Sequence, residues 1–297
     1  DVALLDAGAV LLEWLWLDGK RLKPREVVAE FARHLDDELD LMREAANASQ
    51  LRRNFRNSPL LAVPEIHWQY CSTEVMVMER MHGTPVSAIA EMHAQGIDIP
   101  KLARVGVEIF FTPVFRDGFF HADMHPGNIL VAANGQYVAL DFGIMGSLTE
   151  IDKQYLARNF IAFFRRDYRR VAEVHVEAGY VPPDRDIDEF ARALRAVGEP
   201  IFGMDASRIS MARLLAYLFE VTERFGMQTR TELILLQRTM VVVEGVARSL
   251  DDNINIWDVA RPVVESYIRS HVGPVALIRD LVSTVEVLAR FGPRLPR

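Results

Sequence analysis

The stretch GFFHADMHPGNILV at residues 118–131, followed by ALDFGI at residues 139–144, carries most of the information on this chain's fold. An apolar run that ends at Phe120 is interrupted at His121, and apolar residues resume at Ile129. Between them stand two imidazoles, a carboxylate and a carboxamide. A polar loop between hydrophobic anchors is held firmly enough to aim functional groups. We therefore expect a functional loop here.

A hairpin signal follows this loop directly. Asn134-Gly135 is the residue pair that two-residue hairpin turns prefer, and it lies between two short apolar segments. It predicts that residues 129–133 and 137–140 pair as antiparallel strands. The second strand would bring Asp141 beside Asn128.

The spacing of three polar residues indicates a chemistry. Asn128 lies five residues after Asp123, and Asp141 lies thirteen residues after Asn128. Kinase-like phosphoryl transfer uses this order: an Asp that orients or deprotonates the attacking hydroxyl, then an Asn and an Asp that bind magnesium on the nucleotide phosphates. Mg²⁺ takes hard oxygen ligands and keeps several waters. We predict Asp123 as catalytic residue and Asn128 and Asp141 as metal ligands, with ATP or ADP and Mg²⁺ as cofactors.

Two other interpretations use the same residues. The loop could be an ordinary polar turn that leads into a hairpin. Alternatively, His121, Asp123 and His125 could bind zinc or iron for hydrolysis. Such a site usually draws further ligands from elsewhere, and the other six histidines stand singly in the sequence.

These motifs resemble the ABC1/ADCK/UbiB family of atypical kinases, and most closely its bacterial UbiB members. Three further stretches match the family pattern: ELDLMREAANA at residues 38–48, VMVMERMHG at residues 75–83, and NFIAFF with RDYR at residues 159–164 and 166–169. The resemblance extends over nearly the whole chain. The first two of these stretches are specific to the family, whereas the histidine-rich loop motif also occurs in aminoglycoside and choline kinases.

The resemblance implies an α+β fold of the two-lobed protein-kinase type, with a truncated N-lobe in residues 1–80 and a mainly α-helical C-lobe in residues 81–297. Glu38 and Asp40 correspond to the family's Glu-x-Asp motif in the nucleotide site, where Glu38 would position a phosphate-binding lysine. The main chain of Glu79 and Met81 would contact adenine, with Met78 as gatekeeper.

The resemblance also implies a biological role, as an atypical kinase or ATPase that supports ubiquinone biosynthesis. Its partners would be prenyl-quinone precursor lipids, or the enzymes that modify them. The full-length protein is expected at the cytoplasmic face of the bacterial inner membrane, through transmembrane helices beyond residue 297. The chain itself contains no run of eighteen apolar residues and is expected to be soluble.

One expected part of a kinase small lobe is missing from the sequence. None of the four lysines (Lys20, Lys23, Lys101 and Lys153) lies in a β-rich apolar segment, and no glycine-rich nucleotide loop is present. In the family these parts precede the acidic helix. We therefore expect the chain to be a fragment that is inactive by itself.

Composition limits the partners and the redox chemistry. The formal net charge is −7, which argues against nucleic acid as a partner because phosphate binding needs a basic face. Cys71 is the only cysteine, so no disulfide framework can form. We interpret it as a structural residue.

Periodicity predicts mainly helices around this core. Helices are expected over residues 2–17, from Pro24 to about Phe55 and over residues 100–116, with Asp40 and Glu44 one turn apart on the second helix. Two strands are expected at residues 64–70 and 73–79. Thr84-Pro85 should begin a helix that Gly96 ends. The segment that begins with Asp141-Phe142-Gly143 is called the metal loop below. Ser147 and Glu150 have capping-box spacing for the helix that follows it.

The remainder is predicted to be helical from residue 152 to residue 290, with breaks at residues 181–184, 198–205, 226–228 and 273–274. Residues 275–291 form an amphipathic pattern that suits packing on the core or lying on a membrane. Because the segment from Asp141 to the next helix is short, a peptide-docking activation segment is not expected. Two other function classes stay open: a small-molecule phosphotransferase and a non-catalytic lipid-binding scaffold.

Overall fold

The computed structural model describes residues 40–202, 210–227 and 230–271, together with residues 5, 7–10 and 28; the side chains of residues 201–202 and 211–213 are not described. The predicted helix at residues 275–291, and Glu38, lie outside the described residues. The helices are α4 (Leu41–Asn54), α5 (Ile89–Ala94), α6 (Ile99–Arg116), α7 (Glu150–Phe164), α8 (Tyr168–Glu177), α9 (Ile187–Phe202), α10 (Met211–Arg224), α11 (Thr231–Leu250) and α12 (Ile256–His271).

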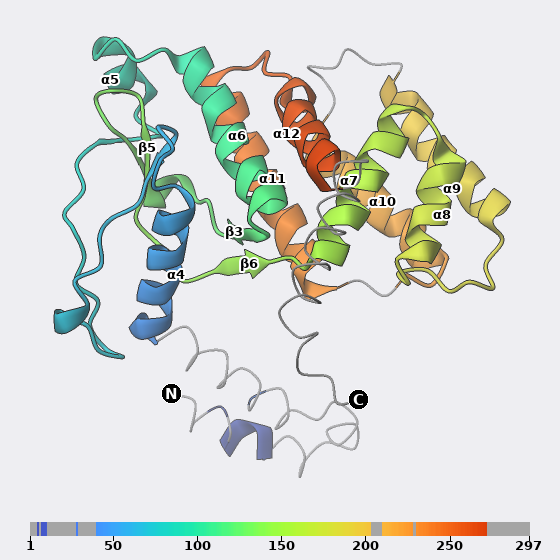
Figure 1. The fold of residues 1–297 in the computed structure, drawn as a ribbon, viewed down its shortest axis with the longest axis horizontal. Coiled ribbons are helices and arrows are strands. Elements are labelled where there is room, and N and C mark those ends of the chain that lie inside the picture. Colours follow the sequence, from blue (N-terminus) through green and yellow to red (C-terminus); the bar gives the residue numbers. More distant parts are fainter. Residues whose placement is uncertain are drawn as a thin grey trace, which may run out of the picture.

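The strands form two small sheets. One has the order β1 (Leu61–Ala62), β5 (Tyr137–Ala139), β4 (Ile129–Val131) and β2 (Thr84–Pro85), with β1 parallel to β5 and the other pairs antiparallel. The second pairs β3 (Phe119–His121) with β6 (Met145–Ser147). Two short 3₁₀ helices are η1 (Trp68–Tyr70) and η2 (Pro126–Asn128). Figure 1 shows α4 and the strands on one side of the molecule, α7 to α10 on the other, and α6 and α11 between them.

The predicted hairpin is confirmed. Ala132 N donates a hydrogen bond to Gln136 O at 2.8 Å, and the register pairs Ile129 with Ala139. Gly135 has φ +81, a backbone conformation that glycine adopts without strain. Because the strands pair in this register, Asn128 and Asp141 are left together just beyond the same end of the hairpin.

Helix α6 is the central element of the core. The Asp98 side chain caps its first turn by accepting a hydrogen bond from Lys101 N at 3.0 Å, and most of the helix's apolar residues are buried. The Tyr137 hydroxyl reaches across from β5 and donates to Leu102 O at 2.9 Å. The tyrosine packs directly on Gly106, where a Cβ would lie 2.7 Å from the Tyr137 hydroxyl oxygen. This close approach fixes the hairpin against the helix that leads into the polar loop.

The helix expected from Pro24 to about Phe55 does not run continuously through Asp40. Asp40 is the N-cap of α4 rather than an interior residue, and its carboxylate accepts a hydrogen bond from Met42 N at 3.0 Å. A short acidic side chain binds free main-chain N–H groups well at this position. Asp40 and Glu44 therefore do not form a pair of like charges on one helix face, because Glu44 is bonded elsewhere.

Several smaller predictions were wrong. Thr84-Pro85 forms β2 against β4 rather than a helix cap, although Gly96 does end α5, with φ +78. The capping box of α7 is Thr149 with Asp152, because Ser147 belongs to β6. Residues 64–79 contain a single antiparallel bridge, Ile66 to Met78, and η1 instead of two full strands. Residues 198–202 continue α9.

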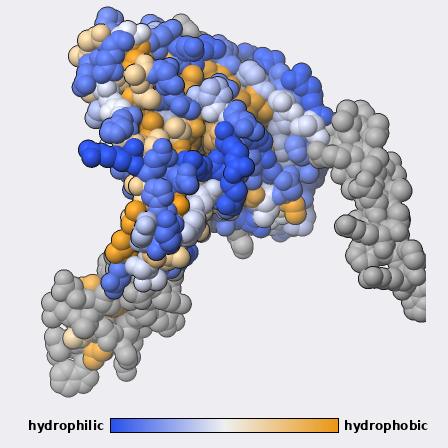
Figure 2. Space-filling model, turned by 60° about the vertical axis from the view of Figure 1, so that its left-hand side comes forward, coloured by the Kyte–Doolittle hydropathy of each residue, from blue (hydrophilic) through white to orange (hydrophobic). Residues whose placement is uncertain are grey.

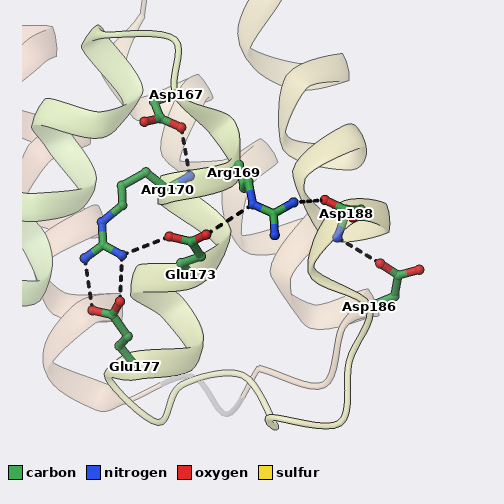
Figure 3. Close-up of polar contacts among 7 residues, drawn as sticks. All are labelled: Asp167, Arg169, Arg170, Glu173, Glu177, Asp186 and Asp188. Carbon is green, nitrogen blue, oxygen red and sulfur yellow. Dashed lines mark hydrogen bonds and ion pairs between the residues drawn. The ribbon is translucent and has the colours of Figure 1, made fainter.

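The Arg-Asp-Tyr-Arg motif at residues 166–169 has a structural role (Figure 3). Asp167 caps α8 by accepting a hydrogen bond from Arg170 N at 3.0 Å, and Arg170 bonds Glu173 and Glu177 at 2.9 and 2.6 Å. Arg169 bonds both Glu173 on its own helix and Asp188 at the start of α9. Exposed ion pairs each add little stability, and of these contacts only the one between Arg169 and Asp188 joins α8 to α9.

Figure 2 shows the molecule turned so that the side with α4 and the strands comes forward. The surface on this side is mostly hydrophilic, with apolar patches between the polar regions. No described helix is both long and apolar enough to cross a bilayer.

Candidate functional site

Asn128 and Asp141 form the centre of the site. The Asn128 side-chain nitrogen donates a hydrogen bond to Asp141 Oδ2 at 2.9 Å, and Leu140 N donates to Asn128 O at 3.1 Å. Asp141 Oδ1 accepts a hydrogen bond from Gly143 N at 3.0 Å. The hairpin thus brings together the carboxamide and carboxylate that the spacing predicted as metal ligands.

His121 joins this pair to the polar loop. Its Nε2 lies 2.5 Å from Asp141 O, and its Nδ1 accepts a hydrogen bond from Asp123 N at 3.1 Å. A carbonyl oxygen needs a donor and a main-chain N–H needs an acceptor, so the ring is the neutral Nε2–H tautomer. Burial lowers the pKa of His121, which keeps it neutral. The ring therefore holds the main chain of Asp123 at a fixed position relative to Asp141.

Asp123 is half-buried, and its carboxylate is more available than that of Asp141, which accepts hydrogen bonds from Asn128 and Gly143. Among the described residues, no group hydrogen-bonds its side chain, whereas its main-chain nitrogen is fixed by His121. The neighbouring Ala122 N donates to Ile144 O at 3.0 Å, which adds a second link between the polar loop and the metal loop. This arrangement leaves the carboxylate free to accept a hydrogen bond, and then a proton, from a substrate hydroxyl.

Two side chains of helix α4 form hydrogen bonds with the metal loop at Phe142. Glu44 Oε1 accepts a hydrogen bond from Phe142 N at 3.1 Å, and the Asn47 side-chain nitrogen donates to Phe142 O at 2.9 Å. The Phe142 side chain is fully buried. Both main-chain polar groups of Phe142 are therefore hydrogen-bonded to α4, and Asp141 is the residue directly before it.

Helix α11 anchors the polar loop from the opposite side. The buried Thr239 hydroxyl lies 2.9 Å from Ala122 O and 2.8 Å from Leu235 O, its own helix's acceptor one turn back. Ala122 lies between His121 and Asp123. This hydrogen bond links helix α11 to the polar loop.

The predicted adenine-binding segment is extended and lies near α4. The Glu79 carboxylate accepts hydrogen bonds from Arg52 Nη1 at 3.3 Å and from Glu65 N at 3.1 Å. Within the described residues, the Glu79 carbonyl and the Met81 amide have no main-chain partner. The roles proposed for Asp40, Glu79 and Met81 in nucleotide binding stay predictions.

The donor set suits magnesium better than zinc or iron. Asn128 and Asp141 offer a carboxamide oxygen and a carboxylate oxygen. Mg²⁺ prefers such hard oxygen ligands, and in nucleotide sites it takes only one or two of them from the protein and the others from phosphates and water. No group of three or more His, Cys, Asp or Glu side chains that could hold a metal occurs in the part of the chain that the structure describes. Both nitrogens of His121 contact main-chain groups, so the alternative zinc or iron site is not supported.

Comparison with known families agrees with this geometry. The ABC1 atypical kinase-like domain matches residues 1–175, which is more than half of the 297 residues, and the UbiB helical domain matches residues 194–255. The chain belongs to the ABC1/UbiB family. The solved structure of Rv3197 with erythromycin, from Mycobacterium tuberculosis, is similar to it. That likeness has a TM-score of 0.58 and 21% identity over 87% of this chain and 67% of the other.

At this identity the structural likeness shows the fold alone. The match to the ABC1 atypical kinase-like domain, together with the mixed helices and strands of the structure, confirms the predicted kinase-like α+β class. The predicted division into lobes at residue 80 stays a prediction. In the sequence of this ABC1/UbiB chain, Glu44 and Asn47 stand within a family motif, and nothing in the motif indicates their contacts with Phe142. Thr239 could not be predicted at all, because a single threonine in a helix gives no signal of a contact far away in the sequence.

Proposed function

We propose that the full-length protein to which this ABC1/UbiB-family chain belongs binds Mg-ATP at the site described above and carries out phosphoryl chemistry there. One observation carries the proposal: the Asn128 carboxamide and the Asp141 carboxylate lie 2.9 Å apart, and His121 bonds the main chain of both Asp123 and Asp141. Kinase-like phosphoryl transfer depends on positioning and charge neutralisation more than on covalent chemistry. Such a rigidly connected set of oxygen ligands would supply the positioning, and the Mg²⁺ that it would hold would supply the charge neutralisation.

The residues have distinct proposed roles. Asn128 and Asp141 would hold Mg²⁺, which neutralises charge on the nucleotide phosphates. Asp123 would orient the attacking hydroxyl or water and accept its proton. His121 positions the loop by hydrogen bonds to its main chain. Glu44 and Asn47 position Asp141 through Phe142.

The segment after the metal loop supports a small or lipid acceptor, or water. Helix α7 begins at Glu150, only nine residues after Asp141, and β6 occupies part of that segment. Protein kinases need a long activation segment there to dock a peptide. A phosphate acceptor that requires a peptide platform is therefore disfavoured.

The biological role that we propose is support of ubiquinone biosynthesis, with prenyl-quinone precursor lipids, or the enzymes acting on them, as partners at the membrane surface. The support for this role is membership of the ABC1/UbiB family and the short segment after Asp141. The contribution of Glu38 and of a phosphate-binding lysine belongs to the same proposal.

Turnover by the full-length protein tests the proposal. Phosphate release and phosphate transfer from γ-labelled ATP would be measured on vesicles containing anionic lipid and a prenylated phenol, for the natural protein and for Asp123→Asn. We expect Asp123→Asn to retain nucleotide binding and to lose roughly 10²- to 10⁴-fold in turnover, the usual contribution of a positioned base. Equal turnover by the two proteins would contradict the role of Asp123.

A further inference from the structure

A surface pocket of about 450 Å³ lies at the C-terminal ends of α4 and α6. Six residues line it: Arg53, Asn54, Arg56, Asn57, Ser58 and Arg116. None of these six residues is acidic and none is apolar. Three positive charges thus gather in one pocket of a chain whose formal net charge is −7. Such a local excess of positive charge suits an anion.

Arg116 is the fixed part of this pocket. Its Nη2 donates a hydrogen bond to Asn54 O at 2.7 Å, and its Nε and Nη2 donate to the Asp117 carboxylate at 2.8 and 2.7 Å. The guanidinium carbon lies 5.3 Å from the centroid of the Phe55 ring. These contacts hold the guanidinium against the end of α4. Its Nη1 has no partner among the described residues, so two N–H donors stay available to a ligand.

The other two arginines are not explained by capping of a helix end. Basic side chains are common at helix C-termini because they hydrogen-bond the last carbonyl groups, as Arg116 does at Asn54 O. The side chains of Arg53 and Arg56 are exposed and form no hydrogen bond or ion pair with any described residue. Like charges that share a pocket repel each other, and an anion between them removes this repulsion.

The neutral side chains of the pocket offer further donors. The amides of Asn54 and Asn57 form no side-chain hydrogen bond within the part of the chain that the structure describes. Ser58 Oγ accepts a hydrogen bond from Leu60 N at 3.3 Å, which leaves its O–H group to donate. Guanidinium groups bind phosphate oxygens in a bidentate manner, and amide and hydroxyl donors can complete such a site. A lipid tail would find no apolar side chain here.

We propose that this pocket binds a phosphate group, free or as the monoester of a small water-soluble molecule, between Arg53, Arg56 and Arg116. Asp117 compensates one of the three positive charges, and the remaining two match the charge of about −1.5 to −2 that a phosphate monoester carries at pH 7. The site is separate from the phosphoryl chemistry proposed at Asp141 and does not depend on it.

A bound phosphate would connect the end of α4 to the end of α6. Arg53 lies in the last turn of α4, Arg56 lies just beyond this helix, and Arg116 is the last residue of α6. The same helix α4 hydrogen-bonds the metal loop through Glu44 and Asn47. Phosphate should therefore stabilise the end of α4 against local opening, which slows exchange of its amide hydrogens.

Binding of inorganic phosphate to the full-length protein, without nucleotide or magnesium, tests the proposal by calorimetry and amide hydrogen exchange. Acetate at the same ionic strength is the reference anion. We expect phosphate, but not acetate, to bind and to slow exchange at residues 51–55. Arg53→Gln and Arg56→Gln should each weaken phosphate binding about tenfold, the contribution of one charge-assisted hydrogen bond, and the double variant should lose it. Glycerol 3-phosphate is measured in parallel, and the tighter ligand distinguishes a phosphate ester from the free ion.

Arg104→Gln is the matched control, because Arg104 is an exposed arginine on α6 that does not line the pocket. This variant should bind phosphate like the natural protein. Absence of phosphate binding, equal binding of acetate, or unchanged phosphate binding by the folded double variant would each overturn the proposal. Because neither nucleotide nor magnesium is present, none of these results depends on whether the Asp141 site binds Mg-ATP.

Discussion

Glu44 accepts a hydrogen bond from the main-chain nitrogen of Phe142 at 3.1 Å, across 98 positions of sequence. This contact connects α4 to the residue directly after Asp141. A carboxylate that orients a metal ligand through its neighbour acts like other outer-sphere groups, whose loss typically weakens metal binding by roughly ten- to a hundredfold. The position of α4 therefore controls the geometry of the candidate magnesium site.

Replacing Glu44 with leucine should weaken Mg²⁺-dependent nucleotide binding by at least about tenfold, because Phe142 N loses its acceptor and the metal loop loosens. The measurement is nucleotide affinity against magnesium concentration. Glu44→Gln keeps an oxygen at this position and should bind nearly as well as the natural protein. If the leucine and glutamine variants were equally impaired, charge rather than hydrogen-bond geometry would be the important property.

Replacing Thr239 with valine should lower the free energy of unfolding by about 1–3 kcal/mol, because the buried Ala122 carbonyl loses a hydrogen-bond donor while the side-chain volume is kept. Chemical denaturation measures this change. Thr231→Val, at the exposed first residue of α11, should change stability by less than about 0.5 kcal/mol. A Thr239→Val protein as stable as the Thr231→Val control would show that the contact with Ala122 adds nothing.

Replacement by alanine should lower the stability of the protein at one glycine and raise it at another. At Gly146 on β6 a Cβ would lie 2.3 Å from the Phe120 ring, so Gly146→Ala should destabilise the protein by about 1–3 kcal/mol through overpacking. At Gly245, inside α11, a Cβ meets nothing within 4 Å, so Gly245→Ala should stabilise by about 0.5–1 kcal/mol. Thermal unfolding of both variants measures the difference. The same sign for both would contradict the packing described here.

Stability should fall as the pH falls below 6.5, partly because of His175. Burial lowers the pKa of this histidine from 6.5 to about 4, so between these values the unfolded chain holds a proton that the folded chain lacks. The contribution of His175 to the free energy of unfolding is complete above pH 6.5 and is lost as the pH falls toward 4. This contribution is about 3 kcal/mol, at roughly 1.4 kcal/mol per unit of the difference in pKa.

His175→Leu should remove this part of the pH dependence, which denaturation curves between pH 4 and pH 7 can measure. His93→Leu, at an exposed position on α5, serves as the control and should leave the slope unchanged. A His175→Leu protein with the slope of the natural protein would mean that His175 is not buried in its neutral form.

Local patterns predicted the parts of this fold that depend on local chemistry. Asn134-Gly135 fixes a tight turn, and the hairpin register then places Asn128 beside Asp141 without any information from distant residues. The cap of α7 shows where such reasoning fails. Ser147 and Thr149 each stand three residues before an acidic residue, and the pairing of Ser147 with Phe119 in the β3–β6 sheet leaves Thr149 as the cap.

Contacts between distant segments could not be read from the sequence in the same way. Thr84 resembles a helix cap until the partner strand β4 is known, and β2 forms because Val131 is available to pair with it. Thr239 and Ala122 lie 117 positions apart, and neither residue type suggests the other. The cavity lined by residues of α6, α7, α8, α10, α11 and α12 depends on the packing of six helices, which no single helical pattern indicates.

Magnesium-dependent nucleotide binding by the full-length protein and its Asp141→Ala variant tests the central claim most directly. Asp184→Ala, an exposed aspartate between α8 and α9, is the matched control. We predict that Asp141→Ala abolishes the magnesium dependence of binding, whereas Asp184→Ala binds like the natural protein. An Asp141→Ala protein that is folded and binds Mg-ATP with unchanged affinity would contradict the assignment of this site.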